Sequence, residues 1–422
     1  MNNLGFVRVA ACAPRLWLGD VNKNKKEILA IISKLEEVSV AVFPELSLCG
    51  STLGNMVSHS LLISACQKAI TDILNTTKNI PTIIIIGAPY YFEGSLYNCA
   101  FVMYKGKLLA VIPKENLSKN ELRFYSRSKE NINNIYFQNY YVKFGNSLVF
   151  ETDNFTFGVE IGEDALLPLS PSTKQAAHGA DIIFNLSAIP AAYGKNNEIK
   201  NLLKAKSFTD NVAYVFANAG YGESTSDNVF TGFCSILELG NLIKQNKPYT
   251  LTSNCIVADC DITKIRHKKI GKYNNINCNN FQTIKIEHQV KYSLPVLRTF
   301  NPKPFIPCEK KLDEQLTEII NIQTNALATR LEKTGIKNIV IGVSGGLDST
   351  LALLVAVKTL QKLNLPNNHI HAITMPGFGT GKKTHSNADK LMSLLNTKYK
   401  TINIEKAVNI HFDDIGHDTT KH

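Results

Sequence analysis

The chain has 422 residues, of which 44% are hydrophobic and 19% are charged, and its formal net charge is +11. This length predicts two domains, and this composition excludes an intrinsically disordered protein. Lysine and arginine are spread along the chain without a dense basic arm, and no apolar run reaches the roughly 18 residues of a membrane helix, so the sequence argues against both a nucleic-acid-binding tail and a membrane span.

Short apolar runs rich in β-branched residues alternate with longer amphipathic stretches from the start of the chain to about residue 260. Strands separated by helix-length segments are typical of a layered α/β fold. Several of these strands are followed by polar or charged residues, at the ends where α/β folds place their ligands. The expected strands are residues 7–11, 40–43, 82–87, 100–104, 157–161, 182–186 and 213–217.

Residues 261–307 combine basic residues, clustered asparagines and prolines, which favour a linker with at most one strand pair. A helix is expected at 312–331, followed by strands at 339–343, 370–375 and 401–404 with helices at 351–363 and 387–395 between them. This βαβαβ series predicts a doubly wound parallel sheet, incomplete and with no helix after its last strand. We therefore assign a first domain to residues 1–260, a linker to 261–307 and a second domain to 308–422.

A glycine-rich loop joins the first strand and the first helix of the βαβαβ series. Its glycines allow positive φ and close backbone approach, and the N–H groups at a helix N-terminus attract phosphate. Its hydroxyls add hydrogen-bond donors, and its carboxylate can hold a Mg²⁺ ion against bound phosphates. The loop consists of Ser344, Gly345, Gly346, Leu347, Asp348, Ser349 and Thr350, with Asp348 as the metal candidate.

The loop resembles the SGGxDS pyrophosphate loop of ATP pyrophosphatases. Residues 374–380, which include Met375, and residues 411–418 narrow the resemblance to the two-domain, glutamine-dependent NAD synthetases. This resemblance implies that Met375 contributes to ATP binding and that the cofactors are ATP and Mg²⁺. It also implies that deamido-NAD is adenylated and then attacked by ammonia, which in that family comes from glutamine.

Members of that family carry an N-terminal nitrilase-like domain with a Glu, Lys, Cys triad. The resemblance makes Glu45, in Phe-Pro-Glu-Leu, the general base, and Lys114, in Val-Ile-Pro-Lys, the oxyanion group. Gly162, in Gly-Val-Glu-Ile-Gly-Glu-Asp, stands at the position of the cysteine nucleophile. Because glycine has no side chain to attack a carbonyl, we expect no glutaminase activity.

Neighbouring positions also depart from the family pattern. Ser51 replaces a usual tyrosine, residues 116–120 differ from the family run, and the glutamate expected near residues 124–126 is absent. Several departures together favour natural decay over an engineered change at Gly162. Cys49 is a weaker candidate for a relocated nucleophile, and a small buried cysteine explains it equally well.

The net charge and the cysteines limit what we expect of the protein's partners and location. The net charge fits either an anionic substrate or a genomic bias toward lysine, and we expect neither a nucleic-acid nor a membrane partner. The nine cysteines lack CxxC spacing, and residues 1–13 lack the order of a signal peptide, so we expect a cytoplasmic protein. Residues 185–188 and 213–225 resemble core and interface segments of the family, which implies a homo-oligomer.

Three hypotheses follow. The leading one is an NAD synthetase, or part of one, that uses free ammonia or another subunit's ammonia. The alternative is a truncated or assembly subunit that binds nucleotide without turnover. A ligase of the same loop type acting on another carboxylate is a third, which the match at residues 375–380 disfavours.

Overall fold

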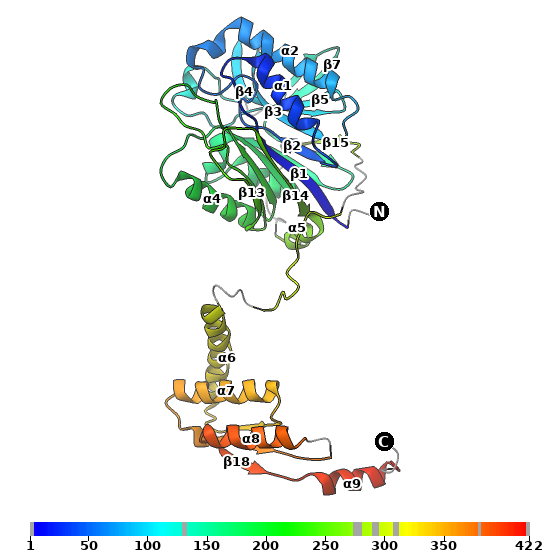
Figure 1. The fold of residues 1–422 in the computed structure, drawn as a ribbon, viewed down its shortest axis with the longest axis vertical. Coiled ribbons are helices and arrows are strands. Elements are labelled where there is room, and N and C mark those ends of the chain that lie inside the picture. The colour runs from blue at the N-terminus through cyan, green and yellow to red at the C-terminus, as the bar shows by residue number, and fades with distance from the viewer. Residues whose placement is uncertain are drawn as a thin grey trace. The chain divides into compact units, whose positions relative to one another are not determined.

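The computed structural model describes residues 4–128, 133–272, 281–288, 295–306, 312–378 and 381–418, apart from the side chains of 382–384 (Figure 1). The chain divides into two compact units, Met1–Thr299 and Phe300–His422. Each unit combines helices with sheets of parallel or mixed strands, which confirms the predicted α/β class. Among the helices of the described segments, none is both long and apolar enough to cross a membrane.

The first unit contains two sheets, and the first of them has eight strands. Their order across the sheet is β14-β1-β2-β3-β4-β5-β7-β6. The bounds are β1 (Phe6–Ala13), β2 (Val40–Val42), β3 (Ile83–Phe92), β4 (Ser95–Tyr104), β5 (Lys107–Pro113), β6 (Asn133–Phe137), β7 (Tyr140–Phe144) and β14 (Asn254–Asp261).

The second sheet has seven strands in the order β13-β12-β11-β10-β9-β8-β15. Parallel pairing of β9, β10 and β11 brings the ends of β9 and β10 to the same edge of this sheet. The bounds are β8 (Leu148–Thr152), β9 (Thr156–Ile161), β10 (Ile182–Ser187), β11 (Ala213–Asn218), β12 (Cys234–Glu238), β13 (Asn241–Gln245) and β15 (Gln282–Ile286).

The two sheets stack with helices on their outer faces. Helices α1 (Val21–Ile32) and α2 (Ser60–Thr76) cover the first sheet, and α3 (Pro171–Ala177) and α4 (Lys195–Thr209) cover the second. Strand β1 is apolar except for Arg8, which pairs with Asp259 at 2.8 Å. Val7, Val9 and Ala11 face the core between the sheets, whereas Ala10 and Cys12 face the helices, so both faces are buried.

The first unit extends beyond the predicted domain end at residue 260. Helix α5 (Ile262–Lys269) follows β14 and buries Ile262 and Ile265, and β15 pairs in parallel with β8. Arg298 then donates two hydrogen bonds to the buried Glu238, which holds the chain on this unit up to Thr299. Residues 273–280, which include the clustered asparagines of the expected linker, lie outside the described segments.

The second unit contains a three-stranded parallel sheet, β16 (Ile339–Gly342), β17 (Ile370–Thr374) and β18 (Lys398–Thr401). This confirms the predicted parallel series. Helices α7 (Leu347–Lys362) and α8 (Lys382–Leu394) pack on the sheet, and α6 (Leu312–Thr334) packs on α7. Leu353 and Leu360 of α7 meet Ile370 and Ala372 of β17 in the core.

Two expectations at the end of this unit are wrong. The last strand is β18 rather than residues 401–404, and helix α9 (Glu405–Asp414) follows it although no helix was expected there. The apolar pair Ile402 and Ile404 suggested a strand, whereas the exposed and polar residues before it form the ladder with β17. Helix α9 has no fully buried residue, but Ile404, Val408 and Phe412 form a half-buried apolar stripe at helical spacing.

Short 3₁₀ helices complete the framework of the described residues. Two of them matter for the site, η2 (Glu121–Arg123) after β5 and η3 (Gly162–Leu166) after β9. The others are η1 (Gly54–Ser58) and η5 (Asn367–His369).

Candidate active site and phosphate loop

The turn after β2 fixes Glu45 against the first sheet. Gly87 on β3 makes this contact possible, because a Cβ there would lie 2.3 Å from the backbone nitrogen of Leu46. The Glu45 Oε1 atom accepts a hydrogen bond of 2.6 Å from Asn98 Nδ2 on β4, and its Oε2 atom accepts one of 3.1 Å from the backbone N–H of Ala188. The carboxylate is thus held by contacts from both sheets.

Lys114 follows β5 and lies between two carboxylates. Its Nζ atom is 2.8 Å from Glu45 Oε1 and 2.6 Å from Glu121 Oε1, and the Lys114 and Glu45 side chains are buried. Burial alone would lower the pKa of Lys114, but the two carboxylates raise it above its usual value. Burial raises the pKa of Glu45 against the opposing effect of Lys114. The ammonium therefore stays charged.

Gly162 begins η3 with a φ of +58° and faces both charged groups. A Cβ at this position would lie 2.5 Å from Glu45 Oε2 and 2.9 Å from Lys114 Nζ. The structure thus brings the three predicted positions together. Because glycine lacks a side chain, the ends of Glu45 and Lys114 take the space in front of its Cα atom.

A buried polar network supports the turn that contains Gly162. Asn185 Nδ2 donates to the Gly162 carbonyl at 3.2 Å, and the Tyr214 hydroxyl donates to Glu160. Glu160 also accepts a hydrogen bond of 2.9 Å from the backbone N–H of Ser172. These contacts come from β10, β11 and α3, so the turn is fixed by the second sheet and its helix layer.

Asp164 ties the Gly162 turn to the segment that follows Lys114. Its carboxylate accepts backbone hydrogen bonds from Glu115 at 3.1 Å and Asn116 at 2.7 Å. Burial raises the pKa of Asp164 to about 8. The two candidate catalytic segments are therefore joined directly by this side chain.

Glu121 is a residue of the site that sequence reasoning missed. The family pattern placed the expected glutamate near residues 124–126, where it is absent, but η2 brings Glu121 onto Lys114 instead. Its Oε2 atom accepts a hydrogen bond of 2.8 Å from the backbone N–H of Ser118. The sequence signal that could have indicated Glu121 is an acidic residue in the short segment after the candidate lysine.

The surroundings of Cys49 argue against a relocated nucleophile. The thiol is buried, and a hydrogen bond with Cys66 together with burial raises its pKa. Nucleophilic attack needs the thiolate, which such surroundings disfavour. Cys49 therefore has the properties of a structural cysteine.

Glu223 is a further buried carboxylate close to this region. Both the backbone N–H and the hydroxyl of Ser51 donate to its Oε1 atom, the hydroxyl at 2.6 Å. Its Oε2 atom is buried and has no hydrogen-bond partner among the described residues. Burial raises the pKa of Glu223 to about 7.

The raised pKa of Glu223 makes the stability of the protein depend on pH. Between the unfolded pKa of 4.5 and the folded value of about 7, the folded state binds more protons, so stability falls as pH rises. We expect Glu223→Gln to remove this contribution and to be more stable than the unchanged chain at pH 9, by at most about 3 kcal/mol. Urea unfolding from pH 5 to pH 9 measures it, with Glu151→Gln at an exposed position of β8 as the control. If the free energy of unfolding changed with pH by the same slope in Glu223→Gln and in the unchanged chain, the expectation would be contradicted.

The predicted phosphate loop of the second unit lies between β16 and α7. Gly345 has a φ of +83°, and the Oγ atoms of Ser344 and Ser349 lie 3.0 Å apart. The N–H of Gly346 donates to Ser344 Oγ at 3.3 Å. These bonds curl the backbone into a tight turn at the helix N-terminus, and Asp348 is exposed in the first turn of α7.

Met375 lies at the same edge of the sheet as this loop. Strands β16 and β17 pair in parallel, with Gly342 opposite Ile373, so the segments after both strands emerge together. A Cβ at Gly342 would lie 3.8 Å from Met375 Cε, and Met375 is exposed. Residues 379–380, the end of the motif that includes Met375, lie outside the described segments.

The residues at the loop fit a Mg²⁺ ion that is held mainly by phosphate. In the part of the chain that the structure describes, no group of three or more His, Cys, Asp or Glu side chains could hold a metal. A single carboxylate such as Asp348 with phosphate oxygens and water is how Mg²⁺ is commonly bound. The loop therefore suits an ion that arrives with a nucleotide.

Two family models match the chain in the regions of these two sites. Residues 8–269 match the carbon-nitrogen hydrolase family, so the chain belongs to the carbon-nitrogen hydrolase family. Residues 319–422 match the NAD synthase family. The two matches in this order give the chain the domain architecture of the glutamine-dependent NAD(+) synthetases.

Curated relatives of the chain are named glutamine-dependent NAD(+) synthetase. The chain is 32% identical to the glutamine-dependent NAD(+) synthetase of Mycobacterium leprae (strain TN), over 98% of this chain and 64% of the relative. It is 26% identical to that of Aquifex aeolicus (strain VF5), over 94% of this chain and 65% of the relative. The chain thus spans about two thirds or less of the length of these relatives.

Solved structures share the fold. The glutamine-dependent NAD(+) synthetase of Cytophaga hutchinsonii matches with a TM-score of 0.55 at 17% identity, over 97% of this chain and 67% of that one. The glutamine-dependent NAD+ synthetase of Acinetobacter baumannii, solved in complex with adenosine diphosphate, matches with a TM-score of 0.52 at 20% identity. The match covers 97% of this chain and 67% of that one. At these identities the likeness shows the fold alone.

Proposed function

We propose that the chain acts as an NAD synthetase, or as part of one, and that it takes ammonia from a source other than its own glutamine hydrolysis. The observation that carries the proposal is Gly162, which stands between Glu45 and Lys114 where a nucleophile would be needed. The phosphate loop of the second unit keeps all its expected residues. The family matches support the synthetase half of the proposal.

In the proposed reaction the phosphate loop binds the pyrophosphate part of ATP. The backbone N–H groups of Gly345 and Gly346 and the hydroxyls of Ser344 and Ser349 would donate to phosphate oxygens, and the α7 N-terminus adds positive potential. Asp348 would hold Mg²⁺, which neutralises phosphate charge when bound. The carboxylate of deamido-NAD attacks the α-phosphorus of ATP and releases pyrophosphate. Ammonia then attacks the acyl adenylate and releases AMP.

The first unit lacks the means to release ammonia from glutamine. Thioester formation needs a thiolate that attacks the amide carbon while a base takes its proton and a cation stabilises the oxyanion. Glu45 and Lys114 provide the base and the cation, but at Gly162 only a hydrogen faces them. The two charged groups instead pair with each other.

The central test offers the full chain two nitrogen sources. With deamido-NAD, ATP and Mg²⁺, we expect ammonium to support formation of NAD and AMP and glutamine to support none. Asp348→Asn is the matched control, and we expect it to lower turnover with ammonium because the loop loses its metal-binding carboxylate. If glutamine supported turnover as well as ammonium does, the proposal that the glutaminase activity is lost would be wrong.

A second candidate is a subunit that binds nucleotide without turnover. Isothermal titration with ATP beside the same assay separates the two functions. Saturable ATP binding without AMP formation supports this second candidate, and AMP formation excludes it. For either function we propose a homo-oligomer that works in the cytoplasm. For the synthetase, free ammonium or a subunit of another kind would supply the nitrogen, because every copy of this chain carries Gly162.

A further inference from the structure

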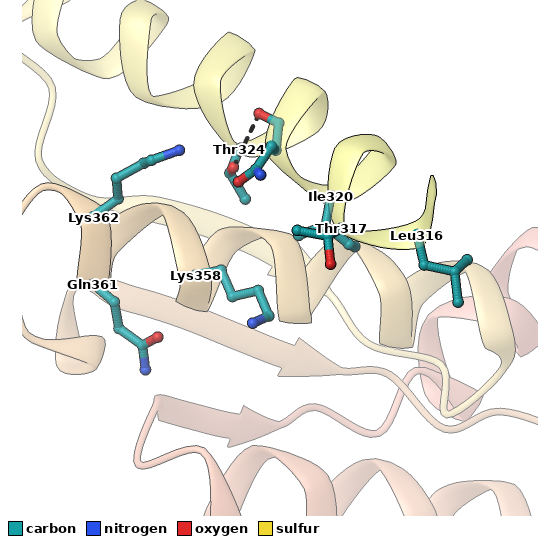
Figure 2. Close-up of a pocket in the computed structure, with 8 residues that line it drawn as sticks. Leu316, Thr317, Ile320, Thr324, Lys358, Gln361 and Lys362 are labelled. Atoms are coloured by element: carbon teal, nitrogen blue, oxygen red, sulfur yellow. Dashed lines mark hydrogen bonds between the residues drawn. The ribbon is translucent and has the colours of Figure 1, made fainter. Parts of the chain in front are cut away.

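The groove between α6 and α7 of the second unit lacks the groups that bind a metal ion or carry redox chemistry. Figure 2 shows residues that line it, and its volume is about 390 Å³. Its polar lining consists of hydroxyl, amide and ammonium groups such as those of Thr317, Gln361 and Lys358, and none of its described lining residues has a thiol, a carboxylate or an imidazole. The cysteines that the structure describes all lie in the first unit.

Two of these cysteines face each other at the edge of the first sheet. Strands β1 and β14 pair antiparallel, and their register places Cys12 directly opposite Cys255. The two Sγ atoms lie 2.9 Å apart, and both thiols are free. Opposite residues of an antiparallel pair have Cα atoms about 4.5 to 5.5 Å apart. Because a disulfide spans Cα separations of about 4.4 to 6.8 Å, the backbone needs no rearrangement to join these sulfurs.

The two thiols differ in their access to solvent. Cys12 is fully buried under the helix layer of the first sheet, whereas Cys255 is partly exposed on the edge strand. The other cysteines of the described segments are buried. Cys49 and Cys66 also contact each other, but both are buried, so a dissolved oxidant reaches neither. Among the described thiols, Cys255 is therefore the one that a small oxidant meets first.

The contact between the sulfurs gives the two thiols different roles. Burial and the neighbouring Cys255 raise the pKa of the Cys12 thiol well above its usual value. Cys12 therefore stays protonated, and its S–H can donate a hydrogen bond to a thiolate at Cys255. Peroxides react with the thiolate rather than the thiol, so Cys255 suits the attacking position and Cys12 the resolving one.

We propose that Cys12 and Cys255 form a modification site, a thiol pair that hydrogen peroxide converts to a disulfide. The Cys255 thiolate attacks one peroxide oxygen, the O–O bond breaks, and the leaving hydroxide takes up the proton that Cys255 lost. The Cys12 sulfur then attacks the sulfenic acid at Cys255, and its proton leaves with the sulfenic hydroxyl as water. The two sulfurs together lose two electrons, which reduce the peroxide. A dithiol reductant reverses the step by thiol-disulfide exchange.

The disulfide would join the two ends of the first unit. Cys12 and Cys255 are 243 positions apart in the chain, and a crosslink over so long a loop restricts the unfolded chain much more than the folded one. The segment after β1 is already held at this edge, since the backbone N–H of Arg15 donates to Ser253 Oγ at 2.7 Å. Oxidation therefore stabilises the first unit and leaves its fold unchanged.

Peptide mapping of the folded full chain after treatment with hydrogen peroxide tests the proposal. Remaining thiols are alkylated in denaturant, and the digest is analysed by mass spectrometry with and without dithiothreitol. We expect a peptide pair joined through Cys12 and Cys255, lighter than the two reduced peptides by the mass of two hydrogen atoms and absent after reduction. The oxidised chain should melt roughly 5 °C or more above the reduced chain.

Three variants separate the roles of the two thiols. Cys255→Ser should form no link and leave Cys12 unmodified, because peroxide does not reach a buried thiol. Cys12→Ala should instead stop at a sulfenic acid on Cys255, which dimedone labels. Cys66→Ala, in the buried pair of touching thiols, is the matched control and keeps both the link and the rise in melting temperature. A folded chain that forms no link between Cys12 and Cys255, links other cysteines in its place, or melts at the same temperature once linked would overturn the proposal.

Discussion

Replacing Gly162 by cysteine is expected to give the first unit a thiol that a diazoketone analogue of glutamine alkylates, whereas the unchanged chain stays unlabelled at this position. The new Cβ would lie 2.5 Å from Glu45 Oε2 and 2.9 Å from Lys114 Nζ, and both are ends of side chains that can shift. The base and the cation would then flank the sulfur. Mass spectrometry of the labelled peptide gives the readout.

The matched control for this variant is Gly162→Ala. It adds the same Cβ at a φ of +58° and carries the same backbone cost of about 1 to 2 kcal/mol, but it brings no nucleophile. We expect both variants to melt a few degrees lower than the unchanged chain and only the cysteine variant to be labelled. Failure of a folded Gly162→Cys chain to react would show that Glu45 and Lys114 no longer form a working site.

Lys114→Met is expected to cost about 3 to 5 kcal/mol of folding free energy at neutral pH. The variant leaves Glu45 and Glu121 close together in a buried site without the ammonium that now lies 2.8 Å and 2.6 Å from them. Their pKa values would rise in the folded variant, so its folded state binds more protons than its unfolded state. Its stability therefore falls as pH rises above about 4.3, the ordinary pKa of a glutamate.

Denaturant unfolding of both chains from pH 4 to pH 8 measures this loss. Lys195→Met removes an exposed pair with Glu198, 3.3 Å long, and is expected to cost less than about 1 kcal/mol. The double variant with Glu45→Gln should recover part of the loss, because one buried charge is gone. A loss in Lys114→Met that is small, or that does not change with pH, would contradict the description of the site as a coupled ion cluster.

The strands that position the site were predictable because both of their faces are buried. A strand such as β1, buried between a sheet and a helix layer, is apolar at every position except Arg8 and is therefore visible in the sequence. Helix α5 was missed since its two buried residues, Ile262 and Ile265, lie among basic ones. Helix α9 was missed although Ile404, Val408 and Phe412 recur at helical spacing, because Ile402 and Ile404 were assigned to a strand.

The residues of the site divide into those that a sequence motif indicates and those that only tertiary contacts bring into place. Family motifs with a fixed chain order indicated Glu45, Lys114 and Gly162, and the fold supplies the distances between them. The contact of Glu121 with Lys114 depends on how η2 folds back, which no periodicity encodes. The support of Gly162 by Asn185 likewise joins residues from neighbouring strands. Such contacts follow from tertiary structure and leave no local pattern.

The exposed position of β18 has a consequence for handling the protein. Among the described strands of the second unit, β18 lies at an edge of its sheet, and all four of its residues are exposed. Unpaired edges of this kind invite strand addition and amyloid-like stacking. Lys398 and Lys400 lie on this edge, and charged lysines are a means by which natural sheets resist such growth. Fibril formation should therefore accelerate once chemical acetylation removes these charges.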